Sequence, residues 1–324
     1  MSKILKRRFN IGVGKEAVRG TLVAPGYWIK PNSEDVEDKV DVQVSERALG
    51  IIEDSEDQQI TKKYAEGTIM GEVMDTSIGL FMLGAFGQVA SVETADTGVY
   101  EHTFSVLQSS QHPSLSVEVK RGDNEQLGYA NCVVGSFKLE AVINDYVKFE
   151  CAIRGKKGVV ASNTPAYVEE NIFMAKDITV RLADDLAGLD GASDVDVRSV
   201  SITENKNIED DDVLGSDTPN DFLNKQFAIE GTMEVLMSDM TFKDYLRNGD
   251  AKAMRLTLVN TDVTIGASSN PGIKVELAKV KFSEAVETGD NNEIVKLAMS
   301  FKGFYSASDA KSIEAVLTNE ATSY

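Results

Sequence analysis

Side chains that usually carry chemistry are scarce in this sequence. It contains two histidines, two cysteines and one tryptophan among 324 residues. His102 and His112 each lie alone near a strand boundary, whereas a hydrolytic triad or a zinc site needs histidine beside Cys, Ser or carboxylates. Cys132 and Cys151 lie in strand-like apolar segments, where we expect buried thiols rather than a disulfide. We therefore expect no enzymatic activity, no catalytic residue, no metal and no cofactor.

Phosphate-binding loops are also missing. The segment Gly12-Val13-Gly14-Lys15 has the glycines of such a loop, but Glu16 follows where a Walker motif needs Ser or Thr. A Rossmann pattern would need glycine at position 17, which is Ala17. The sequence therefore predicts no nucleotide cofactor and no small-molecule substrate.

Positive charge and long apolar runs are lacking as well. Lys and Arg number 33 against 52 Asp and Glu, which gives a formal net charge of −19. A chain this acidic should be repelled by phosphate backbones, which argues against conventional nucleic-acid binding. The longest mostly apolar stretch, 78–86, falls short of the roughly 20 residues that cross a bilayer. Residues 1–10 are basic but lack the apolar part of a signal peptide. We expect no membrane contact, and we expect the protein to be synthesised in the cytoplasm.

What the sequence does contain is an internal repeat. Residues 64–70 match 228–233 around a Glu-Gly-Thr triplet, and 147–155 match 295–303. Both segments of the second match place apolar residues at alternate positions, then a basic residue, then glycine, as one strand used twice would. Matched blocks in the same order predict two copies of one β-rich unit.

Each predicted unit also contains one short helix. Ser77 precedes a helix that ends near Gly87, and Asp239 precedes a helix that ends near Gly249. The pattern is typical of a mostly β (α+β) fold with two tandem domains. The halves divide in the Gly/Ser/Asn/Pro-containing segment 156–166, so we place the domains at 1–160, with an N-terminal arm, and 161–324, with a C-terminal arm.

Two hairpins are expected near the ends of the halves. Residues 137–143 should pair with 147–153 around the turn Asn144-Asp145, and 275–282 with 294–301 around 289–292. An acidic loop precedes the Glu-Gly-Thr strand in each half. The run Asp210-Asp211-Asp212 lacks the alternating spacing of an EF-hand loop, so a solvated or inter-subunit loop is favoured over a cation site.

Three phrases of the sequence resemble a known family. Residues 12–25, GVGKEAVRGTLVAP, are similar to the opening phrase GxGKExxxGTxxxP of siphophage tail tube proteins. Residues 65–69 and 76–80 resemble the family's glycine-containing strand and the PxxIGxLL start of its helix, with Asp75 in place of proline. The resemblance to the major tail tube protein of long non-contractile-tailed bacteriophages is clearest over 10–90 and fainter beyond.

This resemblance implies a β-sandwich or barrel with a flanking helix in each unit. In such tubes, inner sheets of neighbouring subunits join edge to edge around a lumen, and single-domain members form hexameric rings. A chain with two tube domains would then form trimeric rings of pseudo-sixfold symmetry that stack helically into the hollow tail tube conducting DNA into the host. The alternative is another virion tail component, such as a terminator, baseplate hub or decoration protein, built from similar β domains.

The family also uses a long hairpin loop and the terminal arms between successive rings. By position, the candidate ring-stacking residues lie in the two acidic loops: Glu46, Glu53, Asp54, Glu56, Asp57, Lys62, Glu209, Asp210, Asp211, Asp212 and Asp217. The N-terminal arm contributes Lys3, Lys6, Arg7 and Arg8, which could pair with an acidic loop of the next ring, and 309–324 forms the C-terminal arm.

The implied partners are other copies of the chain, the tape measure protein, a tail terminator and the baseplate. Double-stranded DNA would be transient cargo that slides through an acidic lumen without sticking. The implied location is the virion tail, assembled in the cytoplasm of the bacterial host.

Overall fold

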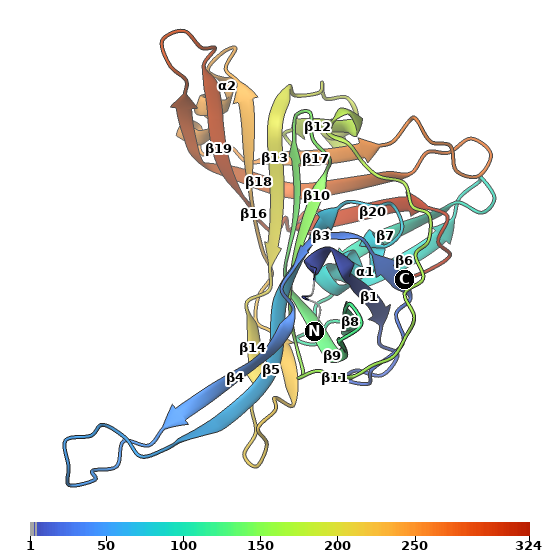
Figure 1. The fold of residues 1–324 in the computed structure, drawn as a ribbon. Helices are drawn as coiled ribbons and strands as arrows, with labels where there is room; N and C mark the ends of the chain where they lie inside the picture. Colours follow the sequence, from blue (N-terminus) through green and yellow to red (C-terminus); the bar gives the residue numbers. More distant parts are fainter. Residues whose placement is uncertain (1–2, 4) are drawn as a thin grey trace.

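The computed structural model describes residue 3 and residues 5–324, and in that part the fold is mostly β, as predicted (Figure 1). Two α-helices and short 3-10 turns interrupt a series of antiparallel strands. The strands of the first half are β1 (Phe9–Lys15), β2 (Tyr27–Ile29), β3 (Pro31–Glu34), β4 (Glu37–Val44), β5 (Gln58–Glu72), β6 (Gly87–Glu93), β7 (Tyr100–Val106), β8 (Leu115–Arg121), β9 (Glu125–Val142) and β10 (Lys148–Gly155). Those that follow are β11 (Val159–Val160), β12 (Ile178–Ala183), β13 (Val197–Asn205), β14 (Ile208–Asp211), β15 (Asp221–Asn224), β16 (Ala228–Leu236), β17 (Lys252–Val259), β18 (Gly272–Thr288), β19 (Lys296–Gly303) and β20 (Ile313–Asn319).

One antiparallel sheet runs through both halves of the chain. Its order is β3/β4–β5–β10–β9–β13–β16–β19–β18, which makes eight strand positions with β3 and β4 sharing the first. The first half supplies four positions and the second half the other four. They meet where β9 pairs with β13, with Leu139 opposite Ile202. The halves are therefore joined by backbone pairing as well as by the covalent chain. We call this the eight-position sheet.

The two halves of this sheet have the same register. Gly67 of β5 lies opposite Ile153 of β10, and Gly231 of β16 lies opposite Phe301 of β19, in each case two residues before the last glycine of the strand. A β-bulge interrupts the β9–β10 pairing at the point that corresponds to a bulge in β18–β19. The pairings β3–β5 and β13–β16 share a second irregularity. The sequence repeat is thus a repeat of strand pairing, irregularities included.

The expected hairpins form, one with a shifted register. Strands β9 and β10 turn at Asn144, whose φ of 62° suits an asparagine. In the second hairpin, Phe282 lies opposite Phe301, so residues 280–288 pair with β19 where 275–282 were expected. Residues 272–277 pair instead with β17 and β20. β18 is 17 residues long and belongs to both layers. Its apolar residues alternate through both parts, so the sequence pattern did not reveal where its partner strand changes.

A second layer of strands covers one face of the eight-position sheet. The N-terminal part of β9 pairs with β8, which continues to β1 and β2. The first part of β18 joins β17 and β12 on one side and β20, β7 and β6 on the other. The core lies between the layers. The segment 309–324, expected as an arm, contributes β20 to this layer, and the Tyr324 side chain is buried beneath Gly79 of the first helix.

The first helix, α1 (Ile78–Phe86), is buried on all sides. It follows Ser77 and ends at Gly87, whose left-handed φ of 92° is the expected glycine cap. Phe81 packs against Phe149 of β10 with ring centroids 5.1 Å apart. Because α1 lies between the sheet and the second layer, its sequence is apolar throughout.

The second helix, α2 (Thr241–Asn248), lies on the surface. Asp239, predicted to open it, accepts a hydrogen bond from the Thr241 N–H at 2.8 Å, and the helix ends at Gly249. Tyr245 stacks on Phe282 of β18 at 6.4 Å, so α2 lies on the same face of the sheet as α1. Cys132 and Cys151 are buried free thiols, and burial raises the pKa of both.

Replacing Gly231 by alanine should destabilise the fold. A Cβ at this position would collide with the Phe301 ring and the Ser201 carbonyl oxygen. We expect a loss of about 1–3 kcal/mol in the free energy of unfolding, measured by urea denaturation. Gly135→Ala is the control, since its Cβ would meet its nearest neighbour, Ile208, at 3.5 Å. Equal stability of the two variants would contradict the close packing at Gly231.

Candidate assembly surfaces

The eight-position sheet has one packed face and one open face. Along β10, Phe149, Cys151 and Ile153 are buried under the helices and the second layer, while Lys148 and Arg154 point to the other side. β19 repeats this alternation. The sequence predicted apolar residues at alternate positions of these strands, and the structure places that apolar set on the packed face and the basic residues on the other face. We call this the open face.

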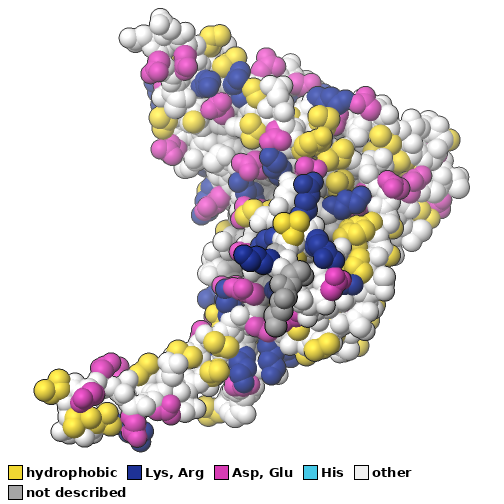
Figure 2. All heavy atoms as spheres, viewed as in Figure 1, with side chains coloured by type: hydrophobic (Ala, Val, Ile, Leu, Met, Phe, Trp, Pro, Cys, Tyr) yellow, Lys and Arg dark blue, Asp and Glu magenta, His cyan; other side chains and the backbone are white. Residues whose placement is uncertain are grey.

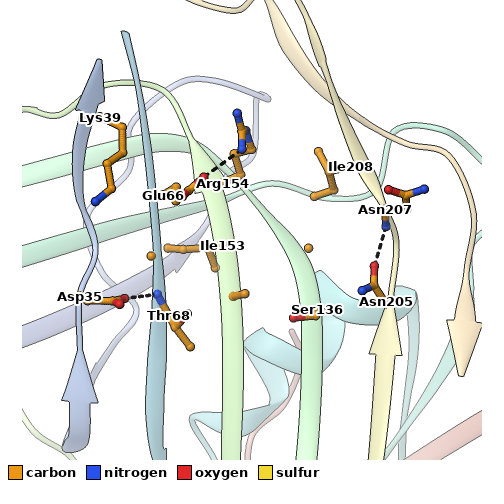
Figure 3. A pocket seen from close by; sticks show the side chains of 13 residues that line it. Asp35, Lys39, Glu66, Thr68, Ser136, Ile153, Arg154, Asn205, Asn207 and Ile208 are labelled. Carbon is orange, nitrogen blue, oxygen red and sulfur yellow. Dashed lines mark hydrogen bonds and ion pairs between the residues drawn. The ribbon is translucent and has the colours of Figure 1, made fainter. Parts of the chain in front are cut away.

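The open face carries charges of both signs. Arg154 of β10 pairs with Glu66 of β5 at 2.9 Å, and Lys302 lies 3.5 Å from Glu230 at the equivalent place in the second half. A hollow of about 400 Å³ crosses this face from β4 to β13. Figure 3 shows that polar and charged side chains form most of its lining, together with Ile153 and Ile208, and that Arg154 lies beside Glu66. The surface is therefore polar and largely charge-paired, without the apolar depth of a substrate pocket.

The hairpin of β4 and β5 projects from the body of the molecule (Figure 1). Val40, Val42 and Ile60 are exposed along it, and Figure 2 shows apolar and acidic side chains together on this projection. Its tip holds five of the predicted stacking residues, all exposed: Glu46, Glu53, Asp54, Glu56 and Asp57. Apolar side chains exposed on a projecting hairpin are typical of a contact surface.

The second acidic segment forms a small hairpin of its own. Glu209, Asp210 and Asp211 belong to β14, which pairs with β15, and Asp212 and Asp217 lie in the loop between them. This hairpin contacts the base of β5 and extends toward the same end of the molecule as the β4–β5 hairpin (Figure 1).

Ion pairs hold the two hairpins together. The Lys62 ammonium lies 2.5 Å from Asp210 and 2.6 Å from Asp212, and Lys63 lies 2.5 Å from Asp217. Partial burial lowers the pKa of Lys62, but hydrogen bonds to both aspartates outweigh this and leave it raised. Arg154 reaches Asp210 at 2.7 Å. Predicted stacking residues of both hairpins therefore make contacts within the chain, which spacing along the sequence could not reveal.

The basic N-terminal segment lies against the first edge of the sheet. Lys6, Arg7 and Arg8 form an exposed 3-10 turn, and Lys3 is exposed before it. Arg8 pairs with Asp123 at 2.8 Å. Lys6 donates a hydrogen bond to the backbone carbonyl of Glu34 in β3. The predicted N-terminal arm also included Met1, Ser2 and Ile4, which lie outside the described residues.

Two strand edges of the eight-position sheet are unpaired within the described part of the chain. At one end, Glu34 of β3 and residues 37–39 of β4 pair only with β5, and the two residues between them continue this edge. At the other end, residues 282–288 of β18 pair only with β19. Unpaired strand edges offer a row of backbone donors and acceptors to another chain. The sequence did not identify these strands as edges, because edge position follows from sheet order and leaves no local pattern.

A buried polar joint fixes the first helix to the second half. Lys206, which follows β13, donates to the carbonyl of Gly84 in α1, and Arg19 pairs with Asp221 at 2.7 Å. His112 Nε2 donates to the Leu107 carbonyl at 2.9 Å. Burial, aided by the charge of Lys206, lowers the pKa of His112 to about 4. Burial raises the pKa of Glu204 to about 8.

Membrane-spanning helices and clusters of metal ligands are absent from the described residues. No helix there is long and apolar enough to span a bilayer. Residue 3 and residues 5–324 contain no cluster of three or more His, Cys, Asp or Glu side chains that could hold a metal ion.

Comparison with known families gives one match. A family model described as phage tail tube protein matches residues 7–303. The match ends at Gly303, the last residue of β19, so it covers both copies of the repeated strand pairs. Comparison with curated proteins finds no match.

Asp210→Asn should loosen the β14–β15 hairpin. The substitution keeps the shape but removes the charge that faces both Lys62 and Arg154. We expect a loss of about 1–3 kcal/mol in unfolding free energy, between the values for exposed and buried pairs. Limited proteolysis should cut faster within 208–224. Asp212→Asn is the control, since the Asp212 side chain is 57% exposed and should change little. Equal effects would contradict the structural role of Asp210.

His112→Gln should change the pH dependence of stability. In the unfolded chain the imidazole takes up a proton near pH 6.5, whereas in the folded chain its pKa is about 4. The unfolded state thus binds more protons in this window, and folded stability falls as the pH drops from 6.5 to 4, by up to about 3 kcal/mol. Urea denaturation at several pH values should show a shallower fall in unfolding free energy for the variant. Both proteins contain the same carboxylates, so the difference between their curves reports the imidazole. Parallel curves would contradict the assignment.

Proposed function

Because the chain belongs to the phage tail tube protein family, a family of structural virion proteins, we propose that it polymerises as stacked rings into the hollow tail tube. The observation that carries the proposal is the eight-position sheet. Each half of the chain contributes four strand positions in a matching register, and in the described part of the chain the two outer strands pair with no further strand. A unit that already joins its own copy inside the chain can join further copies in the same way.

Ring closure removes the unpaired edges. Each chain supplies two units, so a ring of three chains has six units and pseudo-sixfold symmetry. Twenty-four strands at about 4.8 Å spacing close a cylinder about 37 Å across between backbones, and wider if the strands tilt. Two chains would give about 24 Å, too narrow for a duplex of about 20 Å once side chains line the wall. Three chains are the smallest ring that fits.

The open face lines the lumen in this proposal, and the helices lie outside. DNA passing over it would meet cross-strand pairs such as Arg154–Glu66 and Lys302–Glu230 rather than a uniformly acidic wall. Paired charges leave few free cations for phosphates, so the duplex can slide without being held. The acidic lumen stays a prediction, and the paired charges on the open face give a further reason why the duplex would not be held.

The projecting hairpins are the stacking contacts in this proposal. The β4–β5 hairpin and the β14–β15 hairpin point to one end of the chain, where the next ring would lie (Figure 1). Val40, Val42 and the acidic tip would contact that ring. The remaining partners would be the tape measure protein within the tube, a terminator at one end and the baseplate at the other. The chain would act in the virion after assembly in the host cytoplasm, and would catalyse no reaction.

Electron cryo-microscopy of the purified protein at high concentration, without imposed symmetry, tests the proposal. We expect hollow stacked rings with three chains and six similar units. Rings of six whole chains would keep the tube and reject the pseudo-sixfold count. Chains that remain monomeric at high concentration would contradict polymerisation and favour another tail component, such as a terminator or decoration protein.

Val40→Glu combined with Val42→Glu should block stacking while leaving rings intact. The substitutions place charge on the exposed hairpin, away from the sheet core. Size-exclusion chromatography with light scattering should then show single rings in place of tubes. Val160→Glu is the control, since Val160 is also exposed but lies away from the hairpin. Tubes from the double variant would rule out this stacking surface.

A further inference from the structure

The two unpaired edges are the counterparts of the two edges already joined inside the chain. β18 pairs with β19 as β9 pairs with β10, and β3 and β4 pair with β5 as β13 pairs with β16. We propose that residues 284–289 of one chain pair with 34–39 of a second copy in the register that β9 and β13 use. The inference rests on the proposed ring and adds to it the residue pairs at the contact between chains.

The register can be transferred on the β18 side. Lys138 of β9 lies opposite Glu150, which is five residues before Gly155 at the end of β10. Val286 of β18 lies opposite Ala298, which is five residues before Gly303 at the end of β19. Val286 therefore occupies the position of Lys138.

The same comparison places the other edge. Thr203 lies opposite Glu230 and Glu37 lies opposite Glu66, and both glutamates belong to the repeated Glu-Gly-Thr triplet. Glu37 therefore occupies the position of Thr203. Since Lys138 lies opposite Thr203 inside the chain, Val286 should lie opposite Glu37 of the second copy. Two residues along, Glu284 should lie opposite Lys39.

Charge supports this register over its neighbours. Pairing Val286 with Glu37 sets Glu284 against Lys39, an attractive pair, and sets no two like charges opposite each other between 34 and 39. A shift by two residues in one direction would set Glu284 against Glu37 and Glu287 against Glu34.

The opposite shift is no better. It would set Glu287 against Asp38 and Asp290 against Asp35. A shift by one residue would exchange the packed and open faces of the strand. The transferred register is thus the one in which both charge and side-chain direction agree.

The second copy carries a basic surface at the place that the turn after β18 of the first chain would reach. Lys6 and Arg7 line a hollow of about 500 Å³ with residues 31–34 of β3. In the transferred register the turn after β18, which contains Asp290 and Glu293, reaches this hollow. Opposite charges at the end of the strand pair would add to its backbone hydrogen bonds.

Side chains occupy the β3–β4 edge in the free chain. The Val36 N–H donates to the Glu34 carboxylate at 3.2 Å, and the Val36 carbonyl accepts a hydrogen bond from Arg121 at 2.7 Å. The Glu34 carbonyl accepts one from Lys6. A strand from another chain must replace these hydrogen bonds. A single strand pair in a wrong register would therefore gain little free energy over the contacts that it displaces. A full run of complementary pairs is what favours the exchange.

A disulfide scan tests the register. The Asp35 N–H donates to Thr68 of β5, and Glu37, two residues along, directs its backbone groups to the same side. Glu37 and Val286 would therefore form a close pair whose backbone groups are not hydrogen-bonded to each other. The double variant Glu37→Cys with Val286→Cys is oxidised mildly at the concentration that gives rings. Non-reducing electrophoresis should show covalent dimers and trimers, at least about fivefold more than for Glu37→Cys with Glu284→Cys, whose Cα atoms would lie too far apart.

The chain provides its own positive control. Lys138→Cys with Thr203→Cys tests the same geometry inside one chain. It should give an intrachain disulfide, so the oxidised protein should still migrate as a single chain. The native thiols Cys132 and Cys151 are buried, with raised pKa values, and should not react.

The outcomes separate the register from the ring. Rings in electron micrographs with stronger cross-linking at position 284 would overturn the register and leave the ring standing. Rings without interchain cross-links in either variant, while the internal control oxidises, would overturn the edge contact itself. A sample with neither rings nor interchain cross-links would overturn the proposed function as well.

Discussion

Backbone hydrogen bonding between β9 and β13 is the interaction on which the rest of the structure depends. A four-position sheet has two edges, and each edge leaves donors and acceptors without partners. Pairing β9 with β13 satisfies one edge from each half and sets the helices on a common face. It also leaves one edge at each end of the eight-position sheet. The same constraint that joins the halves therefore creates the two surfaces through which the chain can join its copies.

The two halves differ where they meet different surroundings. α1 is apolar throughout because the second layer, Tyr324 and the segment after β13 cover it. α2 occupies the equivalent place but lies on the surface, and its sequence contains apolar residues on one side and polar or charged residues on the other. The loop of the first copy projects as the β4–β5 hairpin, whereas that of the second folds as β14–β15 against β5. The two halves are alike in how their strands pair. They differ where a helix or a loop packs against another part of the chain.

Several features followed from local patterns. Alternating apolar residues identified the paired strands, and glycines at positions 87 and 249 marked the ends of both helices because a left-handed residue is needed there. Asn144 marked a tight turn. The register of β18 was misplaced, because its apolar alternation runs through a change of partner. Asp210 of β14 was expected in a solvated or inter-subunit loop, and its pairing with Lys62 and Arg154 joins segments about 60 to 150 positions apart.

Spacing between nearby residues was enough to predict the class of the fold, the alternation of the strands, the helix ends and the family, because each of these leaves a local pattern in the sequence. The tertiary structure decided which strands are edges, which face of the sheet stays open and which charges are already paired. Those properties depend on the order of strands in the sheet, and no local pattern encodes that order. In the described part of the chain, the edges at 34–39 and 282–288 pair with no further strand, and this is visible only once β9 and β13 are seen to pair.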